Sequence, residues 1–189
     1  MVTRFSVFLT PAADDCAYAG LLIREIGAAY DAPPFEPHVT LHTGPFTALP
    51  PLREAVAAAV AGVPPLTLRV MEVGCSAEYF KTLYIEFEKS PLLSMLHGRL
   101  RAGCGDSGYE LHPHLSLLYG EMPLREKEAL ARRVQLDRTE FHFDEVKIVV
   151  PRNADLGWRD TGQWQTLFRA RLRGGVGQEP GVRGGADDS

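Results

Sequence analysis

An eight-residue pattern occurs twice in this chain. Residues 37–44 read Pro-His-Val-Thr-Leu-His-Thr-Gly, and residues 113–120 read Pro-His-Leu-Ser-Leu-Leu-Tyr-Gly. Near the start of each copy, apolar residues alternate with a histidine and then a hydroxyl residue, and this period of two predicts a β-strand. A single His-x-Ser/Thr triplet carries little information in a chain with six histidines. Two triplets in matching frames indicate an internal repeat, and the fold must accommodate both copies.

Strand and helix patterns alternate along the rest of the chain, with proline and glycine at most of the boundaries. Strand–helix–strand units recur twice, which predicts the α+β class with antiparallel sheets. The predicted strands are residues 4–9, 37–43, 66–73, 82–87, 114–119, 141–150 and 163–172. The predicted helices are residues 11–30, 50–61, 90–102 and 123–134.

The composition is that of a folded protein. The chain has 189 residues, of which 45% are hydrophobic and 23% are charged, which is close to the average for globular domains. From residue 174 onward glycine is frequent and no apolar period continues. We therefore expect one domain over residues 1–173 and a disordered glycine-rich tail over residues 174–189.

Charge and cysteine content narrow the classes of function. The 20 Lys and Arg against 24 Asp and Glu give a net charge of −4, which argues against binding to duplex nucleic acid mainly through phosphate neutralisation. A small anionic ligand held by a few donors remains possible. No apolar run is long enough for a membrane helix, and the N-terminal one is too short for a signal peptide. Cys16, Cys75 and Cys104 lack CxxC spacing, so we expect reduced thiols in the cytoplasm.

The spacing within the repeat places reactive groups on one surface. Residues two apart on a strand share a face, so His38 lies beside Thr40 and His114 beside Ser116. If the two strands face each other across a cleft, two imidazoles and two hydroxyls converge. One neutral imidazole can accept a proton while a protonated one donates, because the ordinary histidine pKa is about 6.5. This set suits in-line cleavage of a phosphodiester, with the hydroxyls holding the phosphate oxygens.

The paired motifs resemble those of the two-histidine (2H) phosphoesterase superfamily. The forms Pro-His-Val-Thr-Leu and His-Leu-Ser-Leu-Leu-Tyr-Gly most resemble its cyclic phosphodiesterase branch. The resemblance covers residues 1–173 and implies a bilobal, duplicated α+β fold with pseudo-twofold symmetry. Two antiparallel sheets with flanking helices would surround a central cleft. It also implies hydrolysis of 2′,3′-cyclic nucleotides to nucleoside 2′-phosphates, and of ADP-ribose 1″,2″-cyclic phosphate to ADP-ribose 1″-phosphate.

The same resemblance implies roles for five residues. His38 and His114 would be catalytic, with His114 activating water and His38 protonating the leaving oxygen. Thr40 and Ser116 would bind the phosphate, and Tyr119 would contact the substrate. Strict alternation turns Tyr119 away from His114, so it reaches the cleft only if the strand ends or bulges there. We expect a monomer that needs no cofactor or metal and takes a small cyclic phosphate or nucleotide.

Three alternatives remain open. The first is a superfamily member that processes RNA ends or 2′,5′-linked RNA. The second is a non-catalytic nucleotide- or RNA-binding module on the same fold. The third is a metallohydrolase, because His42 and His112 also fall on the imidazole face by parity and four imidazoles can bind zinc. Thr40 and Ser116 would have no role in a metal site formed by four imidazoles, so we favour a supporting or structural role for His42 and His112.

Overall fold

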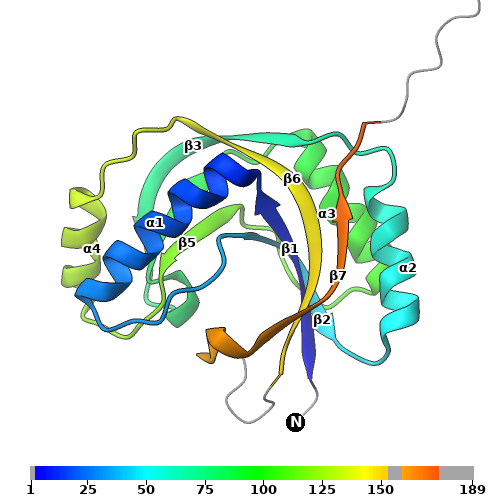
Figure 1. Cartoon of the computed structure of the whole chain (residues 1–189), viewed down its shortest axis with the longest axis horizontal. Helices are drawn as coiled ribbons and strands as arrows, with labels where there is room; N and C mark the ends of the chain where they lie inside the picture. The colour runs from blue at the N-terminus through cyan, green and yellow to red at the C-terminus, as the bar shows by residue number, and fades with distance from the viewer. Residues whose placement is uncertain (1–2, 153–158, 175–189) are drawn as a thin grey trace, which may run out of the picture.

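The computed structural model describes residues 3–152 and 159–174 (Figure 1). Within these residues the fold is α+β, with one seven-stranded sheet in the order β1-β2-β5-β4-β3-β6-β7 and antiparallel pairing throughout. The strands are β1 (Arg4–Pro11), β2 (Val39–Pro45), β3 (Leu66–Cys75), β4 (Leu83–Phe87), β5 (His114–Leu118), β6 (Glu140–Pro151) and β7 (Trp164–Arg171). The helices are α1 (Ala13–Ala29), α2 (Leu49–Val60), α3 (Pro91–Cys104) and α4 (Leu124–Arg133), with short 3₁₀ turns η1 (Tyr79–Lys81) and η3 (Thr161–Gln163).

The predicted class and most of the predicted elements are confirmed. Pro11 is the last residue of β1 rather than the start of a helix, and α1 begins at Ala13. None of the described helices combines the length and apolar character needed to cross a bilayer. Of the predicted tail, residues 175–189 lie outside the described residues.

The strand pairings have twofold symmetry. An additional pairing between β1 and β6 closes the first six strands into a ring. Exchanging β1 with β4, β2 with β5 and β3 with β6 leaves every pairing in this ring unchanged. The first six strands therefore form two copies of one repeat, β1-α1-β2-α2-β3 and β4-α3-β5-α4-β6. The third strand of each repeat pairs with the first strand of the other one, and β7 adds to β6.

The two expected sheets are joined into one. The long strand β6 pairs with β3 through its first residues and with β1 through the rest. On the other side, the halves meet through a single pairing of Val39 with Leu115. Helices also cross between the repeats, because α1 packs on β5 and α3 packs on β2. Figure 1 shows α1 and α4 beside one half of the sheet and α2 and α3 beside the other.

Apolar side chains on the helix-covered face hold this arrangement together. In α3, Ser90 accepts a hydrogen bond from the backbone N–H of Leu93 at 3.1 Å, and Pro91 occupies the first turn, both of which favour helix initiation. The same helix buries Leu93, Leu96 and Leu100. Each fully buried side chain of this kind contributes about 1.5–3 kcal/mol. This core fixes the positions of the two motif strands.

Both motif strands carry a β-bulge at the same position of the repeat. On β2, Phe8 pairs with Thr40 and Val7 pairs with His42, which leaves Leu41 as an extra residue. On β5, Tyr84 pairs with Ser116 and Leu83 pairs with Leu118, which leaves Leu117 extra. A bulge interrupts the alternation of faces. Residues after the bulge therefore point to the opposite face from the one that the sequence pattern predicts.

Candidate active site

Both motif histidines and both hydroxyl residues line one cavity of about 440 Å³ between the two halves of the sheet. The cavity receives side chains from β1 and β2 of the first repeat, from β5 of the second repeat and from the η1 turn that connects the two repeats. It is lined by Arg4, Ser6, Phe8, His38, Thr40, Thr43, Glu78, Phe80, Lys81, Tyr109, Glu110, His112, His114, Ser116, Tyr119 and Trp164. The structure thus brings all five predicted site residues together.

The orientation of His38 follows from its backbone contact. Its Nδ1 lies 2.7 Å from the carbonyl oxygen of Glu36. A carbonyl only accepts hydrogen bonds, so Nδ1 carries the hydrogen and Nε2 is left with its lone pair. The imidazole stacks on Phe8 and meets Trp164 edge-on at 5.6 Å between ring centroids. Nε2 is therefore the ring nitrogen that remains available for chemistry.

His114 repeats this geometry in the second half. Its Nδ1 lies 2.7 Å from the carbonyl oxygen of His112, again the residue two positions earlier. Tyr84 meets the imidazole edge-on with ring centroids 5.4 Å apart. The same tautomer follows, with Nδ1 protonated and Nε2 available. The two copies of the motif therefore present equivalent nitrogens to one cavity.

Burial makes both imidazoles weak bases in the free protein. Loss of water around the ring lowers the pKa of His38 to about 4, and the positive charges of His114 and Lys147 act in the same direction. Burial also lowers the pKa of His114 to about 4, with Lys81 and His112 adding to the effect. The carbonyl hydrogen bond opposes each shift without cancelling it. Both rings are therefore neutral near pH 7 in the free protein.

The two hydroxyl residues differ in their contacts. Within the described part of the chain, the Thr40 hydroxyl has no hydrogen-bond partner, and the Thr40 carbonyl accepts from the Tyr109 hydroxyl at 3.0 Å. The Ser116 hydroxyl donates to the Phe80 carbonyl at 2.8 Å. Thr40 can therefore bind a phosphate oxygen directly, whereas Ser116 must first turn away from Phe80.

Tyr119 reaches the cavity because the strand bulges at Leu117 and ends at Leu118. Burial raises the pKa of its phenol against an opposing effect of the nearby Ser116, so the phenol stays protonated. Its ring stacks on Phe35 with centroids 3.8 Å apart. The bulge in β2 turns Thr43, at the corresponding position of the first repeat, toward the same cavity.

The prediction that His42 lies on the same strand face as His38 is wrong. The bulge at Leu41 turns His42 into the interior, where it is fully buried and, among the described residues, neither ring nitrogen has a partner within hydrogen-bonding geometry. His112 does line the cavity, with its side chain 47% exposed and Nε2 3.5 Å from Glu86. The four histidines proposed for a metal site therefore do not converge. No group of three or more His, Cys, Asp or Glu suited to a metal occurs among residues 3–152 and 159–174.

The sequence pattern missed several cavity residues. The pattern favours a core position for Trp164 on the last strand, yet this residue stands at the start of β7 and borders the cavity. Arg4 and Lys81 supply cationic side chains to the same cavity. Lys81 belongs to the run Tyr79-Phe80-Lys81, whose aromatic rings and cation are the sequence signal for this wall and are compatible equally with stacking on a base and with core packing. Neither Trp164 nor Arg4 belongs to a sequence motif. They reach the cavity because of how β7 and β1 pair with other strands, which the local sequence does not reveal.

A model of the 2′-5′ RNA ligase superfamily matches residues 21–155. No curated protein sequence matches the chain significantly. Among solved structures, Escherichia coli LigT complexed with 3′-AMP is similar, with 15% identity over 91% of this chain and 99% of LigT, at a TM-score of 0.58. TT0787 of Thermus thermophilus has 18% identity over 91% of this chain and 99% of its own, at a TM-score of 0.62. These two likenesses show a shared fold, and the family match shows that the chain belongs to the 2′-5′ RNA ligase superfamily of two-histidine phosphoesterases.

Proposed function

We propose that this protein hydrolyses a small cyclic phosphodiester by a metal-independent, two-histidine acid–base mechanism. The substrate would be a 2′,3′-cyclic nucleotide, opened to the nucleoside 2′-phosphate, or ADP-ribose 1″,2″-cyclic phosphate, opened to the 1″-phosphate. One observation carries the proposal: His38 and His114, each with Nδ1 held by a backbone carbonyl, line one cavity together with Thr40 and Ser116.

In the proposed reaction on a 2′,3′-cyclic nucleotide, a water oxygen forms a bond to phosphorus as the bond to the 3′-oxygen breaks. Nε2 of His114 takes the proton from the water, and Nε2 of His38 gives a proton to the leaving 3′-oxygen. Thr40 and Ser116 hold the non-bridging oxygens as negative charge builds on them. His114 suits the role of base because it is the less buried of the two, whereas His38 is only 7% exposed.

The proton on the acid must arrive with the substrate. Both imidazoles are neutral in the free protein because burial lowers each pKa to about 4. A phosphodiester anion between them favours the charged form of an imidazole and raises its pKa. Binding is therefore coupled to the uptake of one proton. The mutual repulsion between the two imidazolium charges keeps the second ring neutral, as a base must be.

The walls of the cavity suit a nucleotide. Its volume of about 440 Å³ lies in the range of small-molecule sites. The exposed ring of Phe80 and the ring of Trp164 offer flat surfaces to a base. Arg4 and Lys81 can meet phosphate charge at the same site. A second candidate, cleavage at a 2′,5′ linkage or a cyclic RNA end, is favoured by the description of the matched family.

Product analysis with the purified protein tests this proposal. The protein is incubated in EDTA with 2′,3′-cyclic AMP, with ADP-ribose 1″,2″-cyclic phosphate, with a cyclic-ended RNA oligomer and with a 2′,5′-linked dinucleotide. We expect ring opening of a small cyclic phosphate, slowed by roughly 10² or more in His38→Ala. Turnover of the RNA substrates alone would favour the second candidate. Activity that EDTA abolishes and zinc restores would contradict the two-histidine mechanism. Tight binding of all four without turnover would indicate a binding module.

A further inference from the structure

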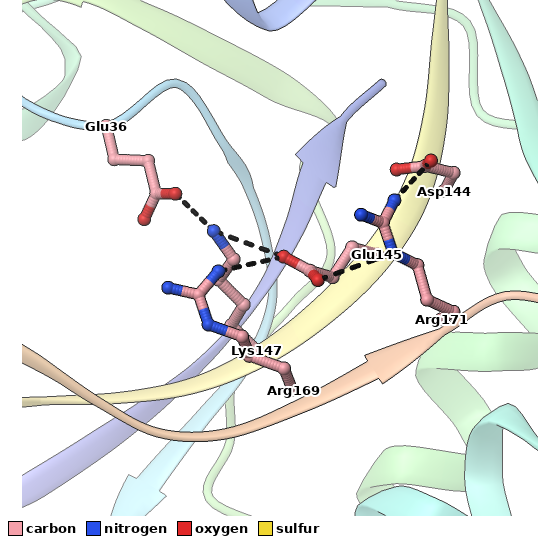
Figure 2. Close-up of polar contacts among 6 residues, drawn as sticks. All are labelled: Glu36, Asp144, Glu145, Lys147, Arg169 and Arg171. Carbon is pink, nitrogen blue, oxygen red and sulfur yellow. Dashed lines mark hydrogen bonds and ion pairs between the residues drawn. The ribbon is translucent and has the colours of Figure 1, made fainter. Parts of the chain in front are cut away.

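Lys147 is a buried cation in the middle of β6. Its side chain is 3% exposed, and its ammonium group contacts the carboxylate of Glu36 and lies 3.3 Å from Oε2 of Glu145 (Figure 2). Glu145 is held in turn by Arg169 at 3.1 Å. An ammonium group is rarely buried without ionic partners, since its desolvation is costly. Of the residues drawn in Figure 2, Lys147 has the most buried side chain, and it is the one that contacts Glu36.

Glu36 connects this network to the candidate active site. Its carboxylate binds Lys147, while its backbone carbonyl accepts the hydrogen bond from Nδ1 of His38. Residues 32–38 form no helix or strand, so no backbone ladder holds this carbonyl in place. Side-chain contacts hold it instead: the Lys147 ion pair and the stacking of Phe35 on Tyr119.

At the position of the second half that corresponds to Lys147, the described part of the chain has a glycine. Lys147 pairs with Phe8, and the residue that corresponds to Phe8 is Tyr84, which pairs with Gly74. A Cβ atom at Gly74 would lie 2.8 Å from the Tyr84 ring, so a side chain there would require Tyr84 to move. The carbonyl that orients His114 belongs to His112, whose side chain is 47% exposed. The His112 ring lies 3.5 Å from Nζ of Lys81 and 3.5 Å from Oε1 of Glu86, so the lysine on this side meets an exposed imidazole and does not form a buried ion pair. The two imidazoles therefore make the same hydrogen bond at Nδ1. They differ in the residue that supplies the carbonyl: the side chain of Glu36 is held by a buried ammonium group, and that of His112 is exposed.

We propose that Lys147 and Glu36 form a positioning pair for His38, which locks its tautomer and makes the two otherwise equivalent histidines unequal. As regards catalysis, this inference rests on the proposed function. Without the ammonium group, the Glu36 carboxylate turns to water and carries its carbonyl away from Nδ1. His38 then exchanges between tautomers, and Nε2 is no longer held in the orientation from which it donates to the leaving oxygen.

The test compares Lys147→Met, which keeps the length of the side chain without its charge, with Lys147→Arg, which keeps the charge. Arg169→Met is the matched control, since it removes a cation from the same Glu145 without touching Glu36. Imidazole ¹⁵N spectra report the tautomer of each histidine. In Lys147→Met we expect the His38 signals to leave the Nδ1–H pattern while those of His114 stay. We also expect kcat to fall by about 10–100-fold with KM nearly unchanged, as for other residues that orient an imidazole. Lys147→Arg and Arg169→Met should match the wild type.

Glu36→Gln provides a second variant that leaves Lys147 paired with Glu145, in case Lys147→Met does not fold. We expect the same change confined to His38. Wild-type His38 signals and wild-type kcat in folded Lys147→Met or Glu36→Gln would overturn the inference. Loss of activity with equal changes at His38 and His114 would also overturn it, because it would indicate a general structural effect. A His38-specific spectral change in a protein with no activity on cyclic phosphates would uphold the positioning pair and refute the proposed function.

Discussion

The ring of Phe8 lies face to face with the imidazole of His38, with ring centroids 3.6 Å apart and an interplanar angle of 16°. Phe8 is placed there by strand pairing, since its partner on β2 is Thr40. Tyr84 covers His114 from the equivalent position, at an interplanar angle of 72°. Each motif histidine is therefore restrained twice, by a carbonyl at Nδ1 and by an aromatic ring on the neighbouring strand. The aromatic ring also keeps water from the imidazole, which lowers its pKa.

Replacing Phe8 should raise the pKa of His38. In Phe8→Ala, water reaches one face of the imidazole, so we expect the pKa to move from about 4 toward the ordinary 6.5. His114 serves as the internal control, and both values are read from an NMR titration. Loss of a buried Phe costs about 3–5 kcal/mol of unfolding free energy, so Phe8→Leu is a milder companion. An unchanged pKa in both variants would mean that the aromatic ring does not control solvation here.

Removing either of the two imidazoles proposed as catalytic should abolish most turnover. In His38→Ala or His114→Ala, one proton transfer loses its donor or acceptor, and we expect kcat to fall by roughly 10² or more. His142→Ala, which removes an exposed imidazole from β6, is the control and should keep wild-type activity. Rates are measured with a 2′,3′-cyclic nucleotide at saturation. Near-normal activity in either single variant would show that the acid–base pair is misassigned.

The pH profile should differ between kcat/KM and kcat. The proposed mechanism needs one protonated and one neutral imidazole, and in the free protein burial lowers the pKa of both to about 4. Above that pH the protonated fraction falls about tenfold per unit, so kcat/KM should decline with that slope from about pH 5 to pH 7. Because the bound anion raises the pKa of the acid, kcat should stay level to higher pH. A kcat/KM maximum near pH 7 would contradict the lowered pKa values.

His42 should be replaceable with a gain in stability. Both its ring nitrogens are buried and have no partner within hydrogen-bonding geometry in the described part of the chain, and such a polar group costs about 1–3 kcal/mol. We expect His42→Leu to raise the unfolding free energy by about 1 kcal/mol and Tm by about 2–4 °C. Activity should be unchanged because His42 points away from the cavity. A lower Tm, or activity lost with the fold intact, would show that this imidazole has a polar partner or a catalytic part.

The α+β class, most strand and helix positions, and the pairing of His38 with Thr40 and His114 with Ser116 could all be read from the sequence. These features depend on local periods and short spacings, and a residue two positions along a strand shares a face whatever the rest of the chain does. The repeat also pointed to duplication. The resemblance built on it is confirmed by the superfamily match over residues 21–155.

Other features appear only when distant segments meet. The bulges at Leu41 and Leu117 arise from pairing with β1 and β4, and they turn His42 inward and Tyr119 toward the cavity. The exchange of third strands joins two expected sheets into one. Lys147 reaches Glu36 across more than a hundred positions of sequence. Local pattern determined which residues could act, and long-range packing decided where they point, because a side chain's direction depends on the strand against which it is registered.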